Sequence, residues 1–447
     1  MESINTVINT VTVVGANGTM GRNIAAIFAS FGNATVYLVS RTYKKSVEAK
    51  NRAYLSVRAE SVKGKMIPAD YAQLEVCISQ SDLVFEACAE DWNIKKEVHK
   101  KISNALDGIQ DAEKKAICIG TSGLSITKLS EFYSENNRKN VMGMHMFNPP
   151  YQMTLCEMTK TKYIDENPEL YNSIVEYTKQ ILHRTVVETA DCSAFLGNRI
   201  GFQFINETIK LAKRYQDNGG IDYIDAIIGP FTGRLMAPLV TANFVGLDVH
   251  KAIIDNLYEN TNDYSHDSFS SEEYLDRLIY NGKIGRKVGE GLYKTIVHDS
   301  GVKIHQVYDI EHDYYREKMN YVFSFSEEMI SNLKIGEYSA AMKALVENHS
   351  LEATLCCELL LKYIVYSLNT AKELGCQMKA ADDVMATGFH WCPPLAMYEA
   401  FSQVCDVKVL CIQRLPAHIL QIVDNNHLFE EIENSTYDYR KFFIAKR

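Results

Sequence analysis

The chain has 447 residues, which is too long for one ordinary hydrophobic core, and domain-size statistics indicate about two to four domains. With 46% hydrophobic and 23% charged residues, the composition excludes a disordered or fibrous protein. The net charge of -9 argues against nucleic acid and anionic membrane surfaces as partners, and no apolar run is long enough to cross a bilayer.

The first part of the chain, up to about residue 190, alternates short β-branched runs with amphipathic stretches. This alternation is typical of βαβ units around a parallel sheet. The predicted helices cover residues 23–31, 93–106 and 168–183, and the predicted strands cover 11–15, 35–40, 83–87, 116–122, 141–147, 155–159 and 184–189. The pattern predicts a doubly wound, Rossmann-like α/β domain over residues 1–190.

The next part has helical periodicity over 196–216, 221–228 and 238–258, followed by a polar loop at 260–273 and a short closing strand at 292–297. We predict an all-α domain over residues 191–300 and a linker to about residue 310. The chain is then helical again, and motifs of the second domain recur in the same order. Ala212-Lys213, Asp225 and Pro238 are followed later by Ala371-Lys372, Asp382-Asp383 and Pro393-Pro394. Residues 301–447 are therefore predicted to be a second, degenerate helical copy.

Cysteine usage and the first residues of the chain bear on its location. The 11 cysteines are an odd number and show neither a CxxC pair nor zinc-finger spacing. The N-terminal sequence lacks the basic segment and apolar core of a secretory signal. We therefore expect a cytoplasmic protein with reduced thiols and no metal site.

A glycine-rich loop, GANGTMG at residues 15–21, follows the first predicted strand and precedes the first helix. The first glycine permits a tight turn, the second lets backbone amides approach a pyrophosphate, and the third lets helix and strand pack closely. Its position in the chain makes this a dinucleotide loop rather than a bare turn. We assign cofactor binding to Gly15, Asn17, Gly18, Thr19, Met20 and Gly21.

The end of the second predicted strand lacks the acid that usually hydrogen-bonds the adenosine ribose. The chain has Ser40 and Arg41 there. We assign both residues to the cofactor site. An arginine at this position can meet a 2'-phosphate, so NADP is an alternative to NAD.

Polar segments follow several predicted strands, at the sheet edge where ligands bind in open α/β folds. They are GTSGLS at 120–125, GMHMFNPP at 143–150 and LCE at 155–157, and FLGNR at 195–199 opens the next domain. With the glycine loop, they resemble the L-3-hydroxyacyl-CoA dehydrogenase family, in which a His-aromatic-Phe-Asn-Pro strand end precedes a Glu by twelve residues. Here His145 and Glu157 have that spacing. The resemblance extends through GKIGRKVGEGLY to about residue 295.

The resemblance implies roles for four residues. His145 would remove the 3-hydroxyl proton in oxidation and return it in reduction, while Glu157 orients the imidazole and stabilises its charged form. Ser122 would hydrogen-bond the substrate oxygen, and Asn198 would reach the same oxygen or the thioester carbonyl. The residue types suit the reaction, because hydride leaves C3 only as a proton leaves the oxygen, which requires a nearby base that titrates near neutral pH.

The resemblance also implies ligands and an assembly. The family places Glu90 and Lys95 near the nicotinamide ribose, uses NAD, and acts on acyl-CoA thioesters in fatty acid metabolism. In its long forms a second helical copy takes the place of a partner's domain, which predicts a monomer with an internal pseudo-dimer, with a homodimer as the alternative.

Departures from the family pattern leave other functions open. Ser193-Ala194 replaces the family's Pro-Gly before the helix, and the segment between Ser40 and Asp82, where the family places a clamp over the CoA, is short. This segment is basic and suits phosphates or a solvated helix face. The alternatives are the same chemistry on a carrier-bound or other small hydroxyacyl substrate, and a catalytically idle nucleotide-binding scaffold.

Overall fold

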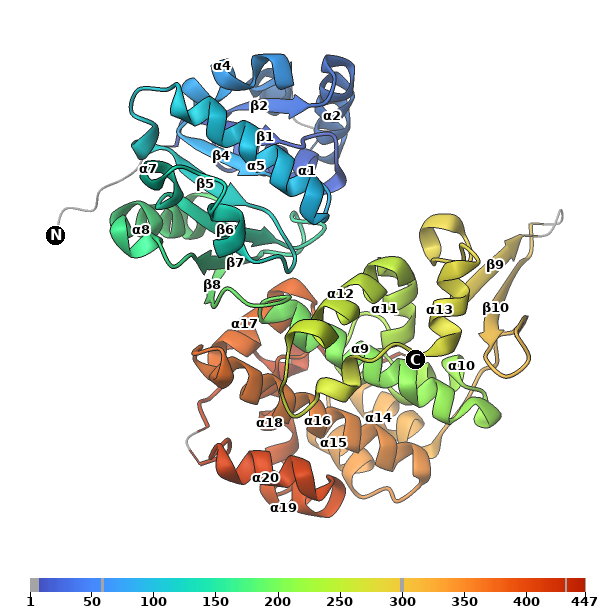
Figure 1. The fold of residues 1–447 in the computed structure, drawn as a ribbon. Helices are drawn as coiled ribbons and strands as arrows, with labels where there is room; N and C mark the ends of the chain where they lie inside the picture. Colours follow the sequence, from blue (N-terminus) through green and yellow to red (C-terminus); the bar gives the residue numbers. More distant parts are fainter. Residues whose placement is uncertain (1–7, 58–59, 298–300, 431, 447) are drawn as a thin grey trace. The chain divides into compact units, whose positions relative to one another are not determined.

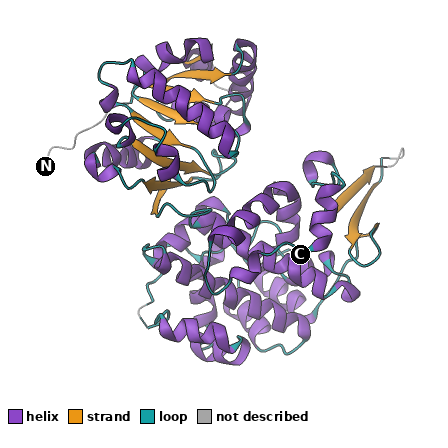
Figure 2. Ribbon diagram, viewed as in Figure 1, coloured by secondary structure: helices purple, strands orange, loops and turns teal. Residues whose placement is uncertain are grey.

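A computed structural model describes residues 8–57, 60–297, 301–430 and 432–446. The chain divides into two compact units, Met1–Phe195 and Leu196–Arg447 (Figure 1). Strands are concentrated in the first unit, and the second is helical apart from one small sheet (Figure 2). In the described residues, no helix is long and apolar enough to cross a membrane.

The first unit is built on an eight-stranded sheet with the order β3-β2-β1-β4-β5-β6-β7-β8. The order reverses direction between β1 and β4, which is the switch point where open α/β sheets bind ligands. The strands are β1 (Thr10–Val14), β2 (Thr35–Ser40), β3 (Met66–Asp70), β4 (Leu83–Glu86), β5 (Ala116–Ile119), β6 (Val141–Met146), β7 (Leu155–Lys160) and β8 (Thr185–Thr189).

Helices cover both faces of this sheet because successive strand residues alternate between two cores. Val13 lies in the core under α1 and α8, whereas its neighbour Val14 lies in the core under α4, α5 and α6. The prediction of a doubly wound domain is confirmed. The helices of this unit are α1 (Thr19–Ser30), α2 (Tyr43–Val57), α3 (Glu60–Lys65), α4 (Leu74–Ser79), α5 (Trp92–Asp107), α6 (Ile126–Ser130), α7 (Glu135–Arg138) and α8 (Pro168–Glu176), which continues as a π-helical turn (Tyr177–Ile181).

Two details of the sheet differ from the prediction. β3 was not predicted, because its five residues include Pro68, a residue that strands tolerate mainly at sheet edges, and β3 is an edge strand. β6 and β7 pair antiparallel, whereas the other neighbours in this sheet pair parallel. The connecting segment, residues 147–154, is too short for the crossover that a parallel pair needs.

The second unit begins with α9 (Gly197–Arg214) and α10 (Ile221–Ile227), as predicted. The predicted single helix over 238–258 is wrong, because Gly246 has a φ of 111° and separates α11 (Pro238–Val245) from α12 (Leu247–Asn260). Within the expected loop at 260–273, residues His266–Phe269 form a 3-10 turn, and α13 (Glu273–Tyr280) follows.

The expected linker to about residue 310 is also wrong. β9 (Tyr293–Val297), β10 (Lys303–Asp309) and β11 (Tyr314–Glu317) form a three-stranded antiparallel sheet in the order β11-β10-β9. Its strands are half-exposed, so they carry little of the apolar signal that reveals a buried strand. The helices that follow are α14 (Ser324–Lys334), α15 (Tyr338–Val346), α16 (Leu351–Glu373), α17 (Met378–Gly388), α18 (Pro394–Ser402), α19 (Val407–Arg414) and α20 (Ala417–Asn425).

One local arrangement occurs twice in the second unit. The carboxylate of Asp225 accepts a hydrogen bond from Leu239 N at 2.9 Å, at the start of α11. Asp382 accepts one from Leu395 N at 2.7 Å, at the start of α18. Each capped helix begins with a proline, so the residues that suggested a repeat in the sequence occupy equivalent places in the structure.

Candidate active site

The glycine loop connects β1 to α1 at the switch point of the sheet. Gly15 has a φ of 85°, and a Cβ there would lie 2.8 Å from the carbonyl of Ala87 and from Cys88 Sγ. A Cβ on Gly21 would lie 2.5 Å from Gly15 O. Gly18 is the N-cap of α1 and brings no side chain to it, so the first amides of this helix are open to an anion. The loop therefore fits a dinucleotide pyrophosphate.

The adenosine side of the site lies at the end of β2. Ser40 is buried there, and the side chain of Arg41 is exposed. The unpredicted strand β3 brings an acid to this place, because Asp70 pairs in register with Ser40. Sequence reasoning missed Asp70, since its strand was not recognised.

The two residues with the family's spacing face each other across the antiparallel pair. His145 on β6 lies directly opposite Glu157 on β7. His145 Nδ1 is 2.8 Å from Glu157 Oε2, and the carboxylate is fully buried. The imidazole packs against the rings of Phe147 and Phe195, whose centroids are 4.6 and 5.6 Å away. Because Nδ1 is bonded to Glu157, Nε2 is the nitrogen available to a ligand.

A pocket in the first unit brings His145 together with Ser122, Glu90 and Met20. These residues come from β6, the loop after β5, the loop after β4 and the start of α1. Its lining is Met20, Ile24, Phe85, Ala87, Cys88, Glu90, Gly120, Thr121, Ser122, Met144, His145 and Met146. Residues predicted for the phosphate loop, the base and the substrate-oxygen contact thus line one cavity.

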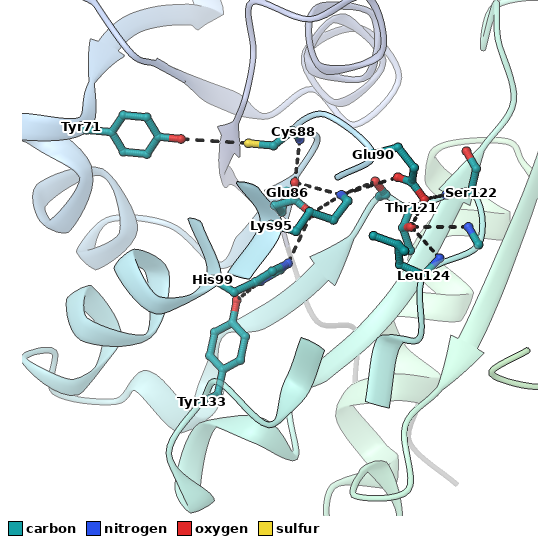
Figure 3. A network of polar contacts seen from close by, with 12 residues as sticks. Tyr71, Glu86, Cys88, Glu90, Lys95, His99, Thr121, Ser122, Leu124 and Tyr133 are labelled. Atoms are coloured by element: carbon teal, nitrogen blue, oxygen red, sulfur yellow. Dashed lines mark hydrogen bonds and ion pairs between the residues drawn. The ribbon is translucent and has the colours of Figure 1, made fainter. Parts of the chain in front are cut away.

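The loop that carries Ser122 is held by hydrogen bonds (Figure 3). Glu90 Oε1 accepts from Ser122 N at 2.9 Å and from the hydroxyl of Thr121. The Thr121 hydroxyl in turn accepts from Leu124 N at 3.1 Å. Glu90 therefore orders the backbone at Ser122 as well as lining the pocket.

Next to this loop, the fully buried side chains of Lys95, Glu86 and His99 form an ionic network that sequence reasoning did not find (Figure 3). Lys95 Nζ donates to Glu86 Oε2 at 2.7 Å and to Gly120 O at 3.1 Å, and it lies 3.9 Å from Glu90. His99 Nε2 is 3.4 Å from Glu86, and its Nδ1 is 2.7 Å from the hydroxyl of Tyr133.

Electrostatics in this network favour the ion pair. Burial alone would raise the pKa of Glu86, but the Lys95 ammonium and His99 outweigh it and hold that pKa at about 2. Burial would likewise lower the pKa of Lys95, yet Glu86 and Glu90 keep it above its ordinary value. Lys95 is therefore charged and buried, supports the Gly120 carbonyl through a hydrogen bond, and does not line the pocket.

Asn198 belongs to the second unit, in the first turn of α9, where it is buried. The adjacent Arg199 forms an ion pair with Asp263 at 2.6 Å and with Glu373 at 3.2 Å, and donates to the hydroxyl of Tyr366 at 3.3 Å. Residues of α16 thus fix the start of α9. Among the described residues, no cluster of three or more His, Cys, Asp or Glu side chains suits a metal ion.

Known proteins share both parts of this architecture. The model of the 3-hydroxyacyl-CoA dehydrogenase NAD-binding domain matches residues 10–192, and that of the C-terminal domain matches residues 195–295. The mitochondrial hydroxyacyl-coenzyme A dehydrogenase of Sus scrofa is 30% identical over 299 residues, which cover 64% of this chain and 90% of that protein. A probable 3-hydroxyacyl-CoA dehydrogenase of Bacillus subtilis is 25% identical over 450 residues, and the match covers 95% of this chain and 55% of that protein.

The fold recurs in a solved structure along nearly the whole chain. The 3-hydroxybutyryl-CoA dehydrogenase of Escherichia coli superposes with a TM-score of 0.67, covering 95% of this chain and 100% of that one at 16% identity, which shows the fold alone. The two family models match in order, and nine tenths of the pig enzyme aligns with this chain. This chain therefore belongs to the 3-hydroxyacyl-CoA dehydrogenase family, whose members are NAD-dependent oxidoreductases of fatty acid metabolism.

Proposed function

We propose that this chain reversibly oxidises an L-3-hydroxyacyl-CoA to the 3-oxoacyl-CoA and that His145 is its acid–base residue. The supporting observation is the His145–Glu157 pair, which lies in the same pocket as Ser122 and the first turn of α1. A buried carboxylate on Nδ1 selects the tautomer and leaves Nε2 to take a proton from a bound hydroxyl.

In the proposed reaction, one residue of the site transfers the proton and the others stabilise charge or orient the substrate. The nicotinamide of NAD, when bound, accepts the hydride from C3. His145 Nε2 takes the hydroxyl proton in oxidation and returns it in reduction. Glu157 stabilises the imidazolium while His145 carries the proton. The Ser122 hydroxyl donates a hydrogen bond to the same substrate oxygen. For Asn198, which belongs to the second unit, a bond to that oxygen or to the thioester carbonyl stays a prediction of the family resemblance.

The choice between NAD and NADP depends on the end of β2. Arg41 favours a 2'-phosphate. Asp70 pairs through its backbone with Ser40, and its carboxylate accepts from Ala72 N at 3.0 Å, so its negative charge at this edge favours a ribose hydroxyl and repels a phosphate. We propose NAD as the physiological cofactor, with NADP as the alternative. The ratio of kcat/KM for NADH to that for NADPH tests this, and it should fall in Asp70→Ala and rise in Arg41→Ala.

The carrier of the acyl group is proposed to be CoA. The basic side chains of α2 and α3 are not fully buried, which suits CoA phosphates. They are Lys44, Lys45, Lys50, Arg52, Lys63 and Lys65, and Arg58 lies outside the described residues. The same cations suit an acidic carrier protein, so carrier-bound 3-oxoacyl groups are the alternative substrates.

The direct test is the purified protein with acetoacetyl-CoA, following the loss of NADH absorbance and, separately, of NADPH absorbance. We expect turnover with NADH. Turnover only with acetoacetyl groups on a carrier protein would favour the alternative substrate. Binding of NADH without turnover on either substrate would favour an idle nucleotide-binding scaffold.

We further propose that residues 191–300 and 301–447 are two copies of one helical domain that form an internal pseudo-dimer. In this relation α9 of the first copy corresponds to α16 of the second, and α10 corresponds to α17. The two long helices α9 and α16 contact each other, α9 contacts α17, and α16 contacts α10. These contacts are reciprocal, as an isologous interface requires. The repeated aspartate caps at α11 and α18 support the same relation. A light-scattering mass near 50.6 kDa is expected, whereas a mass twice as large would support the homodimer.

The proposed location is the cytoplasm. The eleven cysteines, all in the described part of the chain, form no disulfide, and seven of them are buried, as expected for a protein that folds in a reducing compartment. Fractionation of cells with an antibody against the protein checks this, and recovery with extracytoplasmic markers would contradict it.

A further inference from the structure

The segment that leaves the first unit, residues 191–195, is fixed to the loop that carries Ser122. The carboxylate of Asp191 accepts hydrogen bonds from Ser125 Oγ at 2.9 Å, Ile126 N at 2.9 Å and Thr127 N at 2.8 Å. These donors form the start of α6, which directly follows that loop. Glu90 holds the loop at one end, and Asp191 holds it at the other.

The same segment also contacts the imidazole of the site. Phe195 is fully buried, and its ring centroid is 5.6 Å from that of His145. Phe147, which directly follows β6, packs against the imidazole as well, with the ring centroids 4.6 Å apart. The imidazole thus contacts one aromatic ring from the loop after β6 and one from the segment that leaves the first unit. Phe195 belongs to the same hydrophobic core as Ile126 of α6, whose backbone N–H is bonded to Asp191. Asp191 and Phe195 therefore both hold the segment against the start of α6.

The backbone of the segment is held in an unusual conformation. Ala194 has a φ of 58° and Phe195 a φ of 50°, and left-handed backbone is unfavourable for residues other than glycine. Two such residues in succession persist only when their surroundings hold them there. The bonds to Asp191 and the burial of the Phe195 ring supply that support. The conformation directs the ring toward His145.

We propose that Asp191 and Phe195 are positioning residues for the reaction, Asp191 acting through the Ser122 loop and Phe195 acting on the His145 imidazole. The inference rests on the proposed function, in which the imidazole and the Ser122 hydroxyl must converge on one substrate oxygen. A displacement of about 1 Å at such a site can reduce turnover by about 10²-fold. Neither residue lines the pocket, so neither is expected to contact the nucleotide.

The test compares Asp191→Ala and Phe195→Leu with matched controls from the second unit. Asp406→Ala removes a similar cap, since Asp406 Oδ1 accepts from Val409 N at 3.1 Å at the start of α19. Phe401→Leu truncates an equally buried ring. With acetoacetyl-CoA and NADH we expect kcat to fall about 10-fold or more in the two positioning variants, with the NADH dissociation constant unchanged. The controls should keep the kcat of the wild type.

Two readouts separate positioning from loss of stability. The primary deuterium isotope effect on kcat should rise in both positioning variants, because the chemical step becomes slower. Asp191→Asn should lose less activity than Asp191→Ala but more than the controls, because its one amide oxygen can still accept from Ile126 N or from Thr127 N but not from both. Where a truncated variant does not fold, Asp191→Asn and Phe195→Met are measured against the same controls.

Unchanged kcat and isotope effects, with only a lower unfolding midpoint as in the controls, would overturn the inference and leave the segment a structural element. An inactive wild-type protein would instead refute the proposed function. An active wild type with unaffected variants refutes only the roles of Asp191 and Phe195.

Discussion

Replacing Glu157 by glutamine removes one negative charge beside the proposed base while nearly preserving the shape of the side chain. The glutamine oxygen can still accept a hydrogen bond from His145 Nδ1, which is 2.8 Å from the carboxylate oxygen in the structure. The tautomer and orientation of the imidazole are therefore retained. What is lost is the electrostatic stabilisation of the imidazolium that forms when the substrate gives up its proton.

The geometry sets the size of this loss. Glu157 is fully buried and the His145 side chain is 10% exposed, so water screens the pair weakly. Two unit charges about 4 Å apart interact by about 4 kcal/mol at an effective dielectric constant of about 20. If about half of the charge has developed in the transition state, Glu157→Gln loses about 2 kcal/mol, which lowers kcat about 30-fold.

The assay is steady-state oxidation of 3-hydroxybutyryl-CoA, with the dissociation constant of NADH measured separately by fluorescence. We expect the loss in kcat, with nucleotide affinity unchanged. Glu188→Gln is the matched control, since Glu188 lies on the neighbouring strand in register with Met158 and is about half exposed. A kcat within twofold of the wild type, or an equal loss in Glu188→Gln, would refute the reasoning.

Three further substitutions probe the base, the glycine loop and the buried ion pair. His145→Gln should lower turnover by about 10²–10⁴ while NADH binding persists, and surviving activity would mean that another residue is the base. Gly15→Ala should weaken NADH binding more than Gly289→Ala, because both glycines have φ near 85° but only Gly15 has backbone atoms within 2.8 Å of the added Cβ; equal affinities would contradict the close approach. Glu86→Gln removes the closer of the two carboxylates near the buried Lys95 and should cost about 3–5 kcal/mol of unfolding free energy near neutral pH. The pKa of Glu86 is lowered to about 2 from 4.5, so its contribution is present above about pH 4.5 and is lost as the pH falls toward 2. The unfolding free energies of wild type and Glu86→Gln, measured with urea, should approach each other as the pH falls from about 4.5 toward 2. A difference between them that does not change with pH would contradict the ion pair.

The sequence predicted the strands whose apolar side chains are buried in the core. Seven of the eight strands of the large sheet follow from their β-branched runs, and the facing of His145 and Glu157 follows from the resemblance. β3 and the strands β10 and β11 were missed because edge and half-exposed strands carry little apolar signal. The break at Gly246 was missed because the residues on both sides continue a helical pattern, and a helix tolerates a single glycine at a cost of about 1 kcal/mol.

The buried network at Lys95 could not be predicted from residue types alone. The resemblance places a lysine near the nicotinamide ribose, but the pairing of Lys95 depends on Glu86, the last residue of a four-residue strand, and on His99, one helical turn beyond Lys95. Glu86 belongs to the LVFEA segment at 83–87, which carries part of the resemblance, but its residue type does not indicate that it pairs with Lys95 and His99. Their meeting depends on β4 and α5 packing together, so only the structure reveals it. Because Lys95 supports the Gly120 carbonyl at the start of the Ser122 loop, the charge acts on the site through the backbone, and substitution of Lys95 should disturb turnover as well as cofactor affinity.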